Sequence, residues 1–365
     1  MDEYYMKIAL DLANKGRGKV NPNPMVGAII VKDNRIIASG YHKEYGKAHA
    51  EVDAINNAID DVTGATMYVN LEPCFHYGKT GPCVDKIIEK KISRVVIGMV
   101  DPNPMVSGKG ITKLKEAGIE VVVGVLEKES IKLNEVFIKY ITHKKPFVIL
   151  KTATSLDSKI ATISGESKWI TGEESRIDVH KLRGEVSGIM VGIDTIIKDN
   201  PQLTCRVKDT INPIRIIVDS HLRIPMESKV LQGINKAKTI IATTEKADKC
   251  KLSTLTNLGV KVLIVKSKYE RVDLQDLMIK LGELRIDSIL LEGGSTLNFS
   301  ALDECIVDKI QIYIAPKIIG GEKAKTSIGG RGITLLKDAY KVKNLTSSFT
   351  GEDILLEGYI EGGRV

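Results

Sequence analysis

Strand-like and helix-like hydrophobic patterns alternate along the first 145 residues of the chain. Apolar runs at residues 26–31 and 35–40 flank the polar residues Lys32, Asp33 and Asn34, which predicts a β-hairpin. Amphipathic spacing predicts a helix at residues 4–14. The other predicted elements are helices from His49, from Cys83 and at residues 109–117, and strands at residues 66–71, 94–99 and 120–123. Repeated strand and helix units of this kind are typical of a layered α/β domain.

The first domain is predicted to end after one more amphipathic helix, at residues 131–142. Lys144, Lys145 and Pro146 end that pattern, because proline disfavours a helical residue before it. A chain of 365 residues has the length of about two domains. We therefore predict one domain at residues 1–145 and a second at residues 146–365.

The second domain is predicted to begin with a strand at residues 147–154. Helical patterns at residues 173–183 and 274–284 separate several β-rich segments, which favours a mainly parallel sheet. These segments span residues 188–191, 214–219, 239–243, 260–265, 288–291 and 309–315. A late run at residues 353–359 is predicted to add an antiparallel strand.

A glycine turn at residues 290–297, LLEGGSTL, is the sharpest feature of the second domain. A strand ends, glycines permit close backbone approach, and Ser or Thr is predicted to cap a helix, a construction that binds phosphates. Glycine-rich turns between a strand and a helix are often only tight turns, and the dinucleotide fingerprint GxGxxG is absent from this segment. By itself the turn is therefore weak support for a cofactor site.

Composition and charge exclude some classes of protein. The formal charge is +7, spread as 21 basic minus 18 acidic residues up to position 145 and 32 minus 28 beyond it. With aromatic residues at only 5%, no basic strip with stacking platforms is visible, so we expect no nucleic-acid partner. No signal peptide and no apolar run of 18 residues occurs, so no membrane partner is expected. The number of cysteines is odd, five, and three of them, Cys205, Cys250 and Cys305, are scattered singly, so we expect a reducing compartment and a cytoplasmic location.

Four residues near the start of the chain carry recognisable chemistry. His49, Cys74 and Cys83 offer one imidazole and two thiolates, and Glu51 is a carboxylate that need not bind metal. This is the set found in hydrolytic zinc deaminases, in which zinc activates a water molecule and the glutamate transfers its protons. Three protein ligands leave the fourth tetrahedral position open, which indicates a catalytic rather than a structural zinc site.

The spacing of these residues has a physical meaning. Two residues that are two apart face different ways inside a helix, so His49 and Glu51 can converge only at a helix start. Pro82 is predicted as the first residue of the helix that carries Cys83, where a thiol is held as thiolate. A lone His or Cys is more often a packing residue, but the ordered combination favours zinc. Eight residues separate the cysteines, whereas the general deaminase signature has two.

Longer motifs give a specific resemblance. They are NPNPMVG at residues 21–27, HAE at 49–51, LEPCFHYGKTGPC at 71–83, DPNP at 101–104, SLD at 155–157 and GESKWIT at 165–171. With these motifs, the chain resembles the bifunctional deaminase-reductases of riboflavin biosynthesis over almost its whole length. That family also shows the long interval between the two cysteines. The resemblance implies a cytidine-deaminase-like three-layer α/β/α domain followed by a dihydrofolate-reductase-like α/β domain.

For the first domain, the resemblance implies deamination of a diamino-pyrimidinone that carries a ribosylamino 5'-phosphate. The phosphate requires a cation, for which Lys79 is the candidate, and the match to the family motif suggests Asn23 for the pyrimidine ring. The alternatives are a solvated loop lysine and a turn residue, respectively. Four further candidates for substrate binding lie in or near the same motifs. They are His42, His76, Asp101 and Asn103.

For the second domain, the resemblance implies NADPH-dependent reduction of the ribosyl group to ribityl. The implied cofactor contacts are Ala153, Trp169, Thr195, Asp199, Ser220, Gly293 and Gly294. The implied substrate contacts are Ser167, Arg183, Leu203, Arg206 and Glu292. Trp169 could instead be a core residue and the arginines surface charge, and Lys151 has no role that the sequence fixes.

Two other interpretations remain open from the residues alone. One is a nucleoside or nucleic-acid zinc deaminase with an unrelated C-terminal domain, and the other is a zinc-stabilised scaffold without activity. Glu51 argues against the scaffold, because a structural site has no use for a carboxylate beside an open coordination position. The resemblance also implies one zinc ion per chain, a small-molecule substrate and a homo-oligomer.

Overall fold

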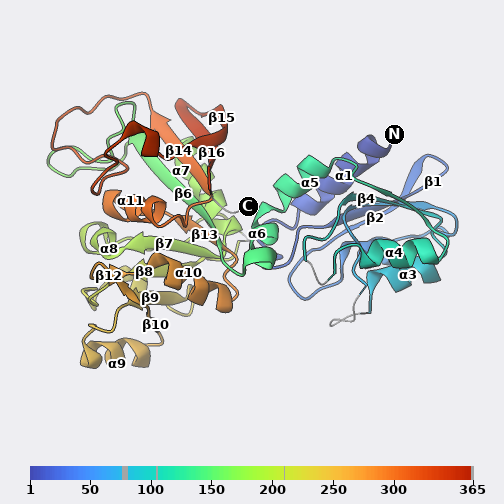
Figure 1. Cartoon of the computed structure of the whole chain (residues 1–365), viewed down its shortest axis with the longest axis horizontal. Helices are drawn as coiled ribbons and strands as arrows, with labels where there is room; N and C mark the ends of the chain where they lie inside the picture. Colours follow the sequence, from blue (N-terminus) through green and yellow to red (C-terminus); the bar gives the residue numbers. More distant parts are fainter. Residues whose placement is uncertain (76–80, 104–105, 209, 363–365) are drawn as a thin grey trace. The chain divides into compact units, whose positions relative to one another are not determined.

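The computed structural model describes residues 1–75, 81–103, 106–208 and 210–362 (Figure 1). The chain divides into two compact units, one at Met1–His143 and one from Lys144 onward. We call them the first and the second unit. The predicted domain boundary after residue 145 lies close to this division.

The first unit is built on a five-stranded sheet of order β2-β1-β3-β4-β5 within the described residues. β1 pairs antiparallel with β2 and β3, whereas β3, β4 and β5 run parallel. The strands are β1 Gly27–Lys32, β2 Arg35–Tyr41, β3 Thr66–Leu71, β4 Arg94–Met99 and β5 Glu120–Val123. The helices are α1 Asp2–Asn14, α2 Ala50–Asn56, α3 Cys83–Glu89, α4 Lys109–Glu116, α5 Glu127–Leu133 and α6 Glu135–His143.

Both faces of this sheet are covered by helices. Ile29 and Val31 of β1 pack with side chains of α1, while Ala28 and Ile30, which alternate with them, pack with the buried side chains of α2, α3 and α4. The predicted three-layer α/β/α architecture is therefore confirmed. The three parallel strands end at one edge of the sheet, where loops of α/β domains collect ligands.

One predicted helix of the first unit is wrong as a single element. The segment predicted as a helix at residues 131–142 belongs to two helices, α5 and α6, with Asn134 between them. The buried Asn134 side chain accepts a hydrogen bond from Met25 N at 2.8 Å and donates one to Met25 O at 3.0 Å. Hydrophobic spacing cannot reveal this break, because Asn134 binds the backbone of Met25, which lies more than a hundred residues away in the sequence.

Gly40 of β2 lies where the sheet meets the helix that follows His49. A Cβ at this position would lie 2.2 Å from Ala54 N and 2.7 Å from Ala50 O of α2. We expect Gly40→Ala to lower the free energy of unfolding of the first unit by about 1–3 kcal/mol, because overpacking forces backbone shifts. Urea denaturation followed by a probe in this unit measures the loss. Gly81→Ala is the control, since a Cβ there meets nothing within 4 Å, and equal effects of the two changes would contradict the prediction.

The second unit is built on a nine-stranded sheet of order β10-β9-β8-β7-β13-β6-β14-β16-β15 within the described residues. Neighbouring strands from β10 to β14 are parallel, and β16 and β15 add antiparallel pairs at one end. The strands are β6 Phe147–Ser155, β7 Gly188–Gly192, β8 Ile214–Val218, β9 Thr239–Thr243, β10 Lys261–Ile264, β13 Ser288–Leu291, β14 Lys309–Ala315, β15 Val342–Thr350 and β16 Asp353–Ile360. The mainly parallel sheet and the late antiparallel strand are confirmed.

Helices also cover both faces of the second sheet. α10 (Leu274–Glu283) and α11 (Ser295–Asp303) contribute buried side chains to one core cluster, with Leu150 and Leu291 of the sheet. α8 (Ile193–Asp199) and α9 (Lys249–Asn257) contribute to another, and α7 (Glu173–Glu185) packs Val179 against Tyr313. Two short 3₁₀ turns, Lys229–Leu231 and Leu336–Asp338, and a small hairpin of β11 (Ser267–Lys268) and β12 (Arg271–Val272) complete the unit.

The sequence-based prediction lacks α8, α9 and β15 of the second unit, as well as the short hairpin of β11 and β12 and the two 3₁₀ turns. β15 is exposed at nearly every position, so it has no alternation of apolar and polar residues to predict it. The strand forms because its backbone pairs with β16. Among the described residues, no helix has the length and apolar composition needed to span a membrane.

Candidate functional site

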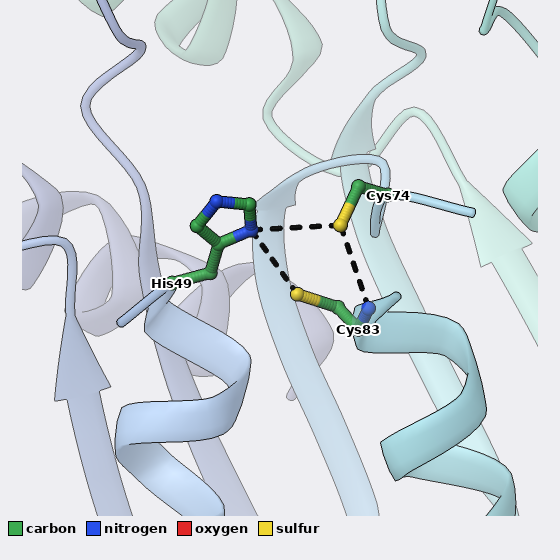
Figure 2. A group of neighbouring side chains, drawn as sticks. All are labelled: His49, Cys74 and Cys83. Atoms are coloured by element: carbon green, nitrogen blue, oxygen red, sulfur yellow. Dashed lines mark hydrogen bonds between the residues drawn. The ribbon is translucent and has the colours of Figure 1, made fainter. Parts of the chain in front are cut away.

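Three side chains of the first unit meet at the carboxyl edge of its sheet (Figure 2). His49 is the N-cap of α2, with extended backbone angles (φ −71°, ψ 160°), and Cys83 is the first residue of α3. Cys74 follows β3. The predicted helix start at His49 is confirmed, while Pro82 is the N-cap of α3 rather than its first residue.

The ligand atoms are spaced for a small tetrahedral metal ion. His49 Nδ1 lies 3.3 Å from Cys83 Sγ and 3.5 Å from Cys74 Sγ, as the dashed lines in Figure 2 show. Tetrahedral zinc with its usual bond lengths separates a nitrogen from a sulfur ligand by about 3.6 Å. The observed separations therefore fit one zinc ion bound by these three residues.

The side chains of Cys74 and Cys83 shift each other's pKa in opposite directions. The hydrogen bond from the Cys83 thiol lowers the pKa of Cys74 well below its ordinary value, and the same bond, together with burial, raises the pKa of Cys83. Cys83 N also donates to Cys74 Sγ at 3.4 Å. This environment stabilises negative sulfur, which is the form that binds a metal.

Glu51 is buried beside these ligands, with 4% of its surface exposed. Burial, and next the negative charge of Cys74, raise the pKa of Glu51 to about 7. A carboxyl group with a pKa near neutrality can both accept and return a proton at physiological pH. Its place, on the first turn of the helix that His49 caps, brings the two side chains of the HAE motif to one site.

Asn23 and His42 form a hydrogen-bonded chain next to the metal ligands. His42 Nδ1 lies 3.0 Å from Ala48 O, and His42 Nε2 lies 3.1 Å from Asn23 Nδ2. A carbonyl can only accept, so Nδ1 carries the proton and Nε2 accepts from the amide of Asn23. His42 is 3% exposed, and its ring lies edge-on to the His49 ring at 5.8 Å. His42 therefore fixes the orientation of Asn23, and the expectation that His42 also contacts the substrate stays a prediction.

Two buried asparagines hold the segment that carries Asn23. Asn134 bonds both backbone groups of Met25, as described above, and Asn70 Nδ2 donates to Met25 O at 3.0 Å. Asn70 Oδ1 accepts from Gly27 N at 2.8 Å. Sequence reasoning missed both residues, although Asn70, a polar residue inside the apolar run at residues 66–71, was a signal.

The other predicted substrate residues of the first unit divide into two groups. Asp101 and Asn103 follow β4 at the same carboxyl edge, and Asp101 Oδ1 accepts from Asn103 N at 2.9 Å. His76 and Lys79 lie outside the described residues.

A largely buried group of charges marks the second unit. Glu292 follows β13 and accepts hydrogen bonds from Arg183 Nε at 2.8 Å and Nη2 at 2.9 Å, while Lys151 Nζ lies 3.8 Å from its carboxylate. Burial lowers the pKa of Lys151. Although burial alone would raise it, the charges of Lys151 and Arg183 lower the pKa of Glu292 to about 2. Lys151 is the residue for which sequence reasoning found no role.

More side chains surround this charge group. Tyr313 donates to Asp178 Oδ2 at 2.6 Å, and its ring centre lies 5.9 Å from Lys151 Nζ. Arg183 Nη1 donates to Thr204 O at 3.3 Å, which brings the segment with Leu203 and Arg206 to the site. The Leu203 side chain is buried in the core, so the prediction that it binds substrate can hold only for its backbone.

The predicted cofactor residues come from the carboxyl ends of adjacent parallel strands. β8, β7, β13 and β6 are neighbours in the sheet, and the residues lie at or after their ends. They are Ser220 after β8, Thr195 and Asp199 on α8 after β7, Gly293 and Gly294 after β13, and Ala153 near the end of β6. A Cβ on Gly294 would lie 3.8 Å from Thr195 Oγ1, so these two positions meet.

The glycine turn has the features of a phosphate cradle. The N-cap of α11 is Gly294, without a capping side chain, so the predicted Ser or Thr cap is wrong. A Cβ on Gly293 would lie 2.6 Å from Asn298 Oδ1, a buried oxygen without a hydrogen-bond partner among the described residues. Uncapped amides beside glycines without side chains suit the pyrophosphate of a dinucleotide. The residues present therefore fit a dinucleotide cofactor.

Ser167 and Trp169 lie between β6 and α7. The Trp169 side chain is 63% exposed, which excludes the alternative that it is a core residue, and its ring centre lies 4.8 Å from the Arg176 guanidinium.

Comparison with known protein families assigns both parts of the chain. Residues 1–99 match the family described as "Cytidine and deoxycytidylate deaminase zinc-binding region". Residues 146–356 match the family described as "RibD C-terminal domain". The alternative of an unrelated C-terminal domain is therefore wrong, and the activity of the second unit is a reduction.

Relatives align over the full length. The riboflavin biosynthesis protein RibD of Actinobacillus pleuropneumoniae is 50% identical over 97% of this chain and 94% of its own, and that of Aquifex aeolicus is 46% identical over 98% of both. Among solved structures, Acinetobacter baumannii RibD has a TM-score of 0.89 at 36% identity, covering 99% of both chains. A Thermotoga maritima diaminohydroxyphosphoribosylaminopyrimidine deaminase/5-amino-6-(5-phosphoribosylamino)uracil reductase has a TM-score of 0.85 at 41% identity, again covering 99% of both. With its zinc-deaminase unit and its reductase unit in this order, the chain belongs to the RibD family of bifunctional deaminase-reductases of riboflavin biosynthesis.

Proposed function

We propose that this enzyme removes the ring amine of 2,5-diamino-6-(5-phosphoribosylamino)pyrimidin-4(3H)-one and then reduces the ribosyl group. The product is 5-amino-6-(5-phosphoribitylamino)uracil. The observation that carries the proposal is the meeting of His49, Cys74 and Cys83 beside the buried Glu51. Residues 1–145 are the deaminase domain and residues 146–365 the reductase domain in this proposal.

In the deaminase unit, His49, Cys74 and Cys83 hold one zinc ion. Zinc, when bound, supplies a Lewis acid that lowers the pKa of a water molecule. Glu51, which is buried beside these three residues, takes the proton of the attacking water and passes it to the departing ammonia. Asn23, whose amide nitrogen is occupied by His42, presents its oxygen to an N–H group of the pyrimidine. Asp101, Asn103, His76 and Lys79 complete the substrate site, with Lys79 on the phosphate.

In the reductase unit, NADPH supplies the hydride. The cofactor is held by Gly293 and Gly294 together with Ala153, Trp169, Thr195, Asp199 and Ser220. The reaction adds a hydride to C1' of the open-chain imine and a proton to its nitrogen. Lys151, a largely buried ammonium whose pKa is lowered by desolvation, is the proton source in this proposal. Glu292 keeps Lys151 and Arg183 in place, and Arg183, Arg206, Ser167 and the Leu203 backbone bind the substrate.

We also propose that the protein is a cytoplasmic homo-oligomer. The edge strand β15 exposes large apolar side chains, with Leu345 57% and Phe349 79% exposed. Long apolar edge strands are places where a second chain can pair or pack. The location rests on the scattered free cysteines, which suit a reducing compartment.

Mass spectrometry of the diamino-pyrimidinone ribotide tests the proposed function. Incubation with the purified protein alone is expected to replace one NH by O, and addition of NADPH is expected to add two hydrogens. Dialysis against a zinc chelator should abolish the first change and leave the reduction of pre-formed deaminated substrate intact, and zinc should restore it. If the zinc-loaded protein changes neither mass, the substrate assignment falls.

A further inference from the structure

Glu72 is a buried acid that the chemistry proposed above does not use. It follows β3 and stands two residues before the metal ligand Cys74, in the sequence LEPC. Its surface is 3% exposed. A carboxylate is costly to bury unless several hydrogen bonds satisfy its oxygens, so its partners indicate why it is there.

Four backbone N–H groups donate to this carboxylate. Oε2 accepts from Asp101 N at 3.1 Å and from Gly108 N at 3.0 Å, and Oε1 accepts from Gly110 N at 2.9 Å and Ile111 N at 3.2 Å. The first oxygen thus binds Asp101, which comes shortly after β4, and Gly108, the N-cap of α4. The second oxygen binds the first turn of α4, whose N-cap Gly108 has no side chain to cap it.

The contact also ties this segment to the metal site. Gly110 packs against the backbone of the LEPC motif so closely that a Cβ there would lie 2.3 Å from Pro73 O. Glu72 N donates to Met99 O at 3.0 Å, which joins the residues that follow β3 to the end of β4. One short stretch, Glu72 to Cys74, therefore carries the candidate metal ligand Cys74 and fixes the backbone of the described residues 101–103.

We propose that Glu72 is a positioning residue for deamination. It holds the segment with Asp101 and Asn103 in the place where these residues bind the substrate, without touching substrate or metal itself. Asn103 depends on this anchor, because its own N–H bonds Asp101, whose N–H in turn bonds Glu72. The inference rests on the proposed role of Asp101 and Asn103 in substrate binding.

Glu72→Gln is the sharpest change to this anchor. The amide keeps the shape of the carboxyl group but replaces one acceptor oxygen by an NH₂ group. In either orientation, that NH₂ group faces two backbone N–H donors, so two of the four hydrogen bonds are lost. The binding-competent arrangement of the segment then becomes a minor fraction of the molecules, and apparent affinity falls in proportion to that fraction.

The experiment measures kcat and KM for deamination of the diamino-pyrimidinone ribotide by the full-length zinc-loaded enzyme. For Glu72→Gln we expect KM to rise at least about tenfold while kcat stays within about threefold of the unchanged protein, the pattern of lost binding without lost chemistry. Glu72→Asp, which keeps the charge on a shorter side chain, should shift KM in the same direction by less. Glu116→Gln makes the same chemical change at an exposed site on α4 and should change neither constant.

Zinc content, reductase activity and melting temperature are measured on the same samples. A KM for both Glu72 variants within twofold of the unchanged protein overturns the proposal. A fall in kcat at constant KM also overturns it, because a purely structural role reduces the number of active molecules. Loss of zinc would show that Glu72 serves the metal ligand instead. If Glu72→Gln does not fold, Glu72→Asp decides. If the unchanged protein fails to deaminate the ribotide, the proposed function fails first.

Discussion

The Glu51→Gln variant is expected to lose deamination by a factor of about 10²–10⁴, the usual contribution of a positioned acid-base group. The amide fills the same buried place on α2 but cannot accept a proton from water or return one to ammonia. Because Glu51 is not one of the three ligands, we expect zinc to stay at one ion per chain. The reduction should continue at its normal rate, since its residues belong to the second unit.

The measurement combines product mass, zinc content and NADPH oxidation on one sample of the variant. Glu89→Gln, an exposed site on α3 that pairs with Lys86, is the matched control and should leave all three unchanged. Loss of folding or of zinc in Glu51→Gln would contradict a catalytic role and point to a structural one. Normal deamination in this variant would remove Glu51 from the mechanism.

The Glu292→Gln variant is expected to lose reduction and retain deamination, which is the reverse of the result expected for Glu51→Gln. Its carboxylate is the shared counterion of Arg183 and Lys151, and all three side chains are less than one-fifth exposed. Removing one partner of a buried charge group leaves the others uncompensated, which lowers the free energy of unfolding by up to about 3–5 kcal/mol. Displacement of Lys151 by about 1 Å would slow the reaction by about 10²-fold.

NADPH oxidation with the deaminated ribotide measures the activity of this variant, and urea denaturation measures its stability. Glu283→Gln, at an exposed site on α10, makes the same change in the same unit and should have little effect on either. A Glu292→Gln enzyme that reduces the ribotide at the normal rate would exclude a role for this charge group. A stable but inactive variant would separate its catalytic from its structural contribution.

Deaminase chemistry could be predicted from the sequence because its key residues lie in short local motifs. His49 and Glu51 stand at a helix start, and Cys83 at another, so the hydrophobic pattern and the spacing already place them. The α/β layers were predictable for a related reason. Burial of both faces of a mainly parallel sheet leaves continuous apolar runs in the strands and one-sided patterns in the helices.

Contacts between distant segments could not be predicted in this way. Lys151 meets Glu292 because β6 and β13, far apart in sequence, are parallel neighbours in the sheet. Strand order does not appear in hydrophobic periodicity, so the sequence left Lys151 without a role. The sequence pattern also failed to predict the helix break at Asn134 and the exposed strand β15, because each depends on a partner elsewhere in the chain.

The sequence by itself therefore determined the chemistry at each motif, including the ligand set His49, Cys74 and Cys83, and the succession of strands and helices. Only the tertiary structure decided which residues hold the chemical groups in position without reacting themselves. Glu72 illustrates the difference, because a glutamate before a Pro-Cys pair is unremarkable until its oxygens are seen to collect four backbone N–H groups. Residue types reveal what a side chain can do, whereas its pKa, its orientation and its partners depend on neighbours that folding brings together.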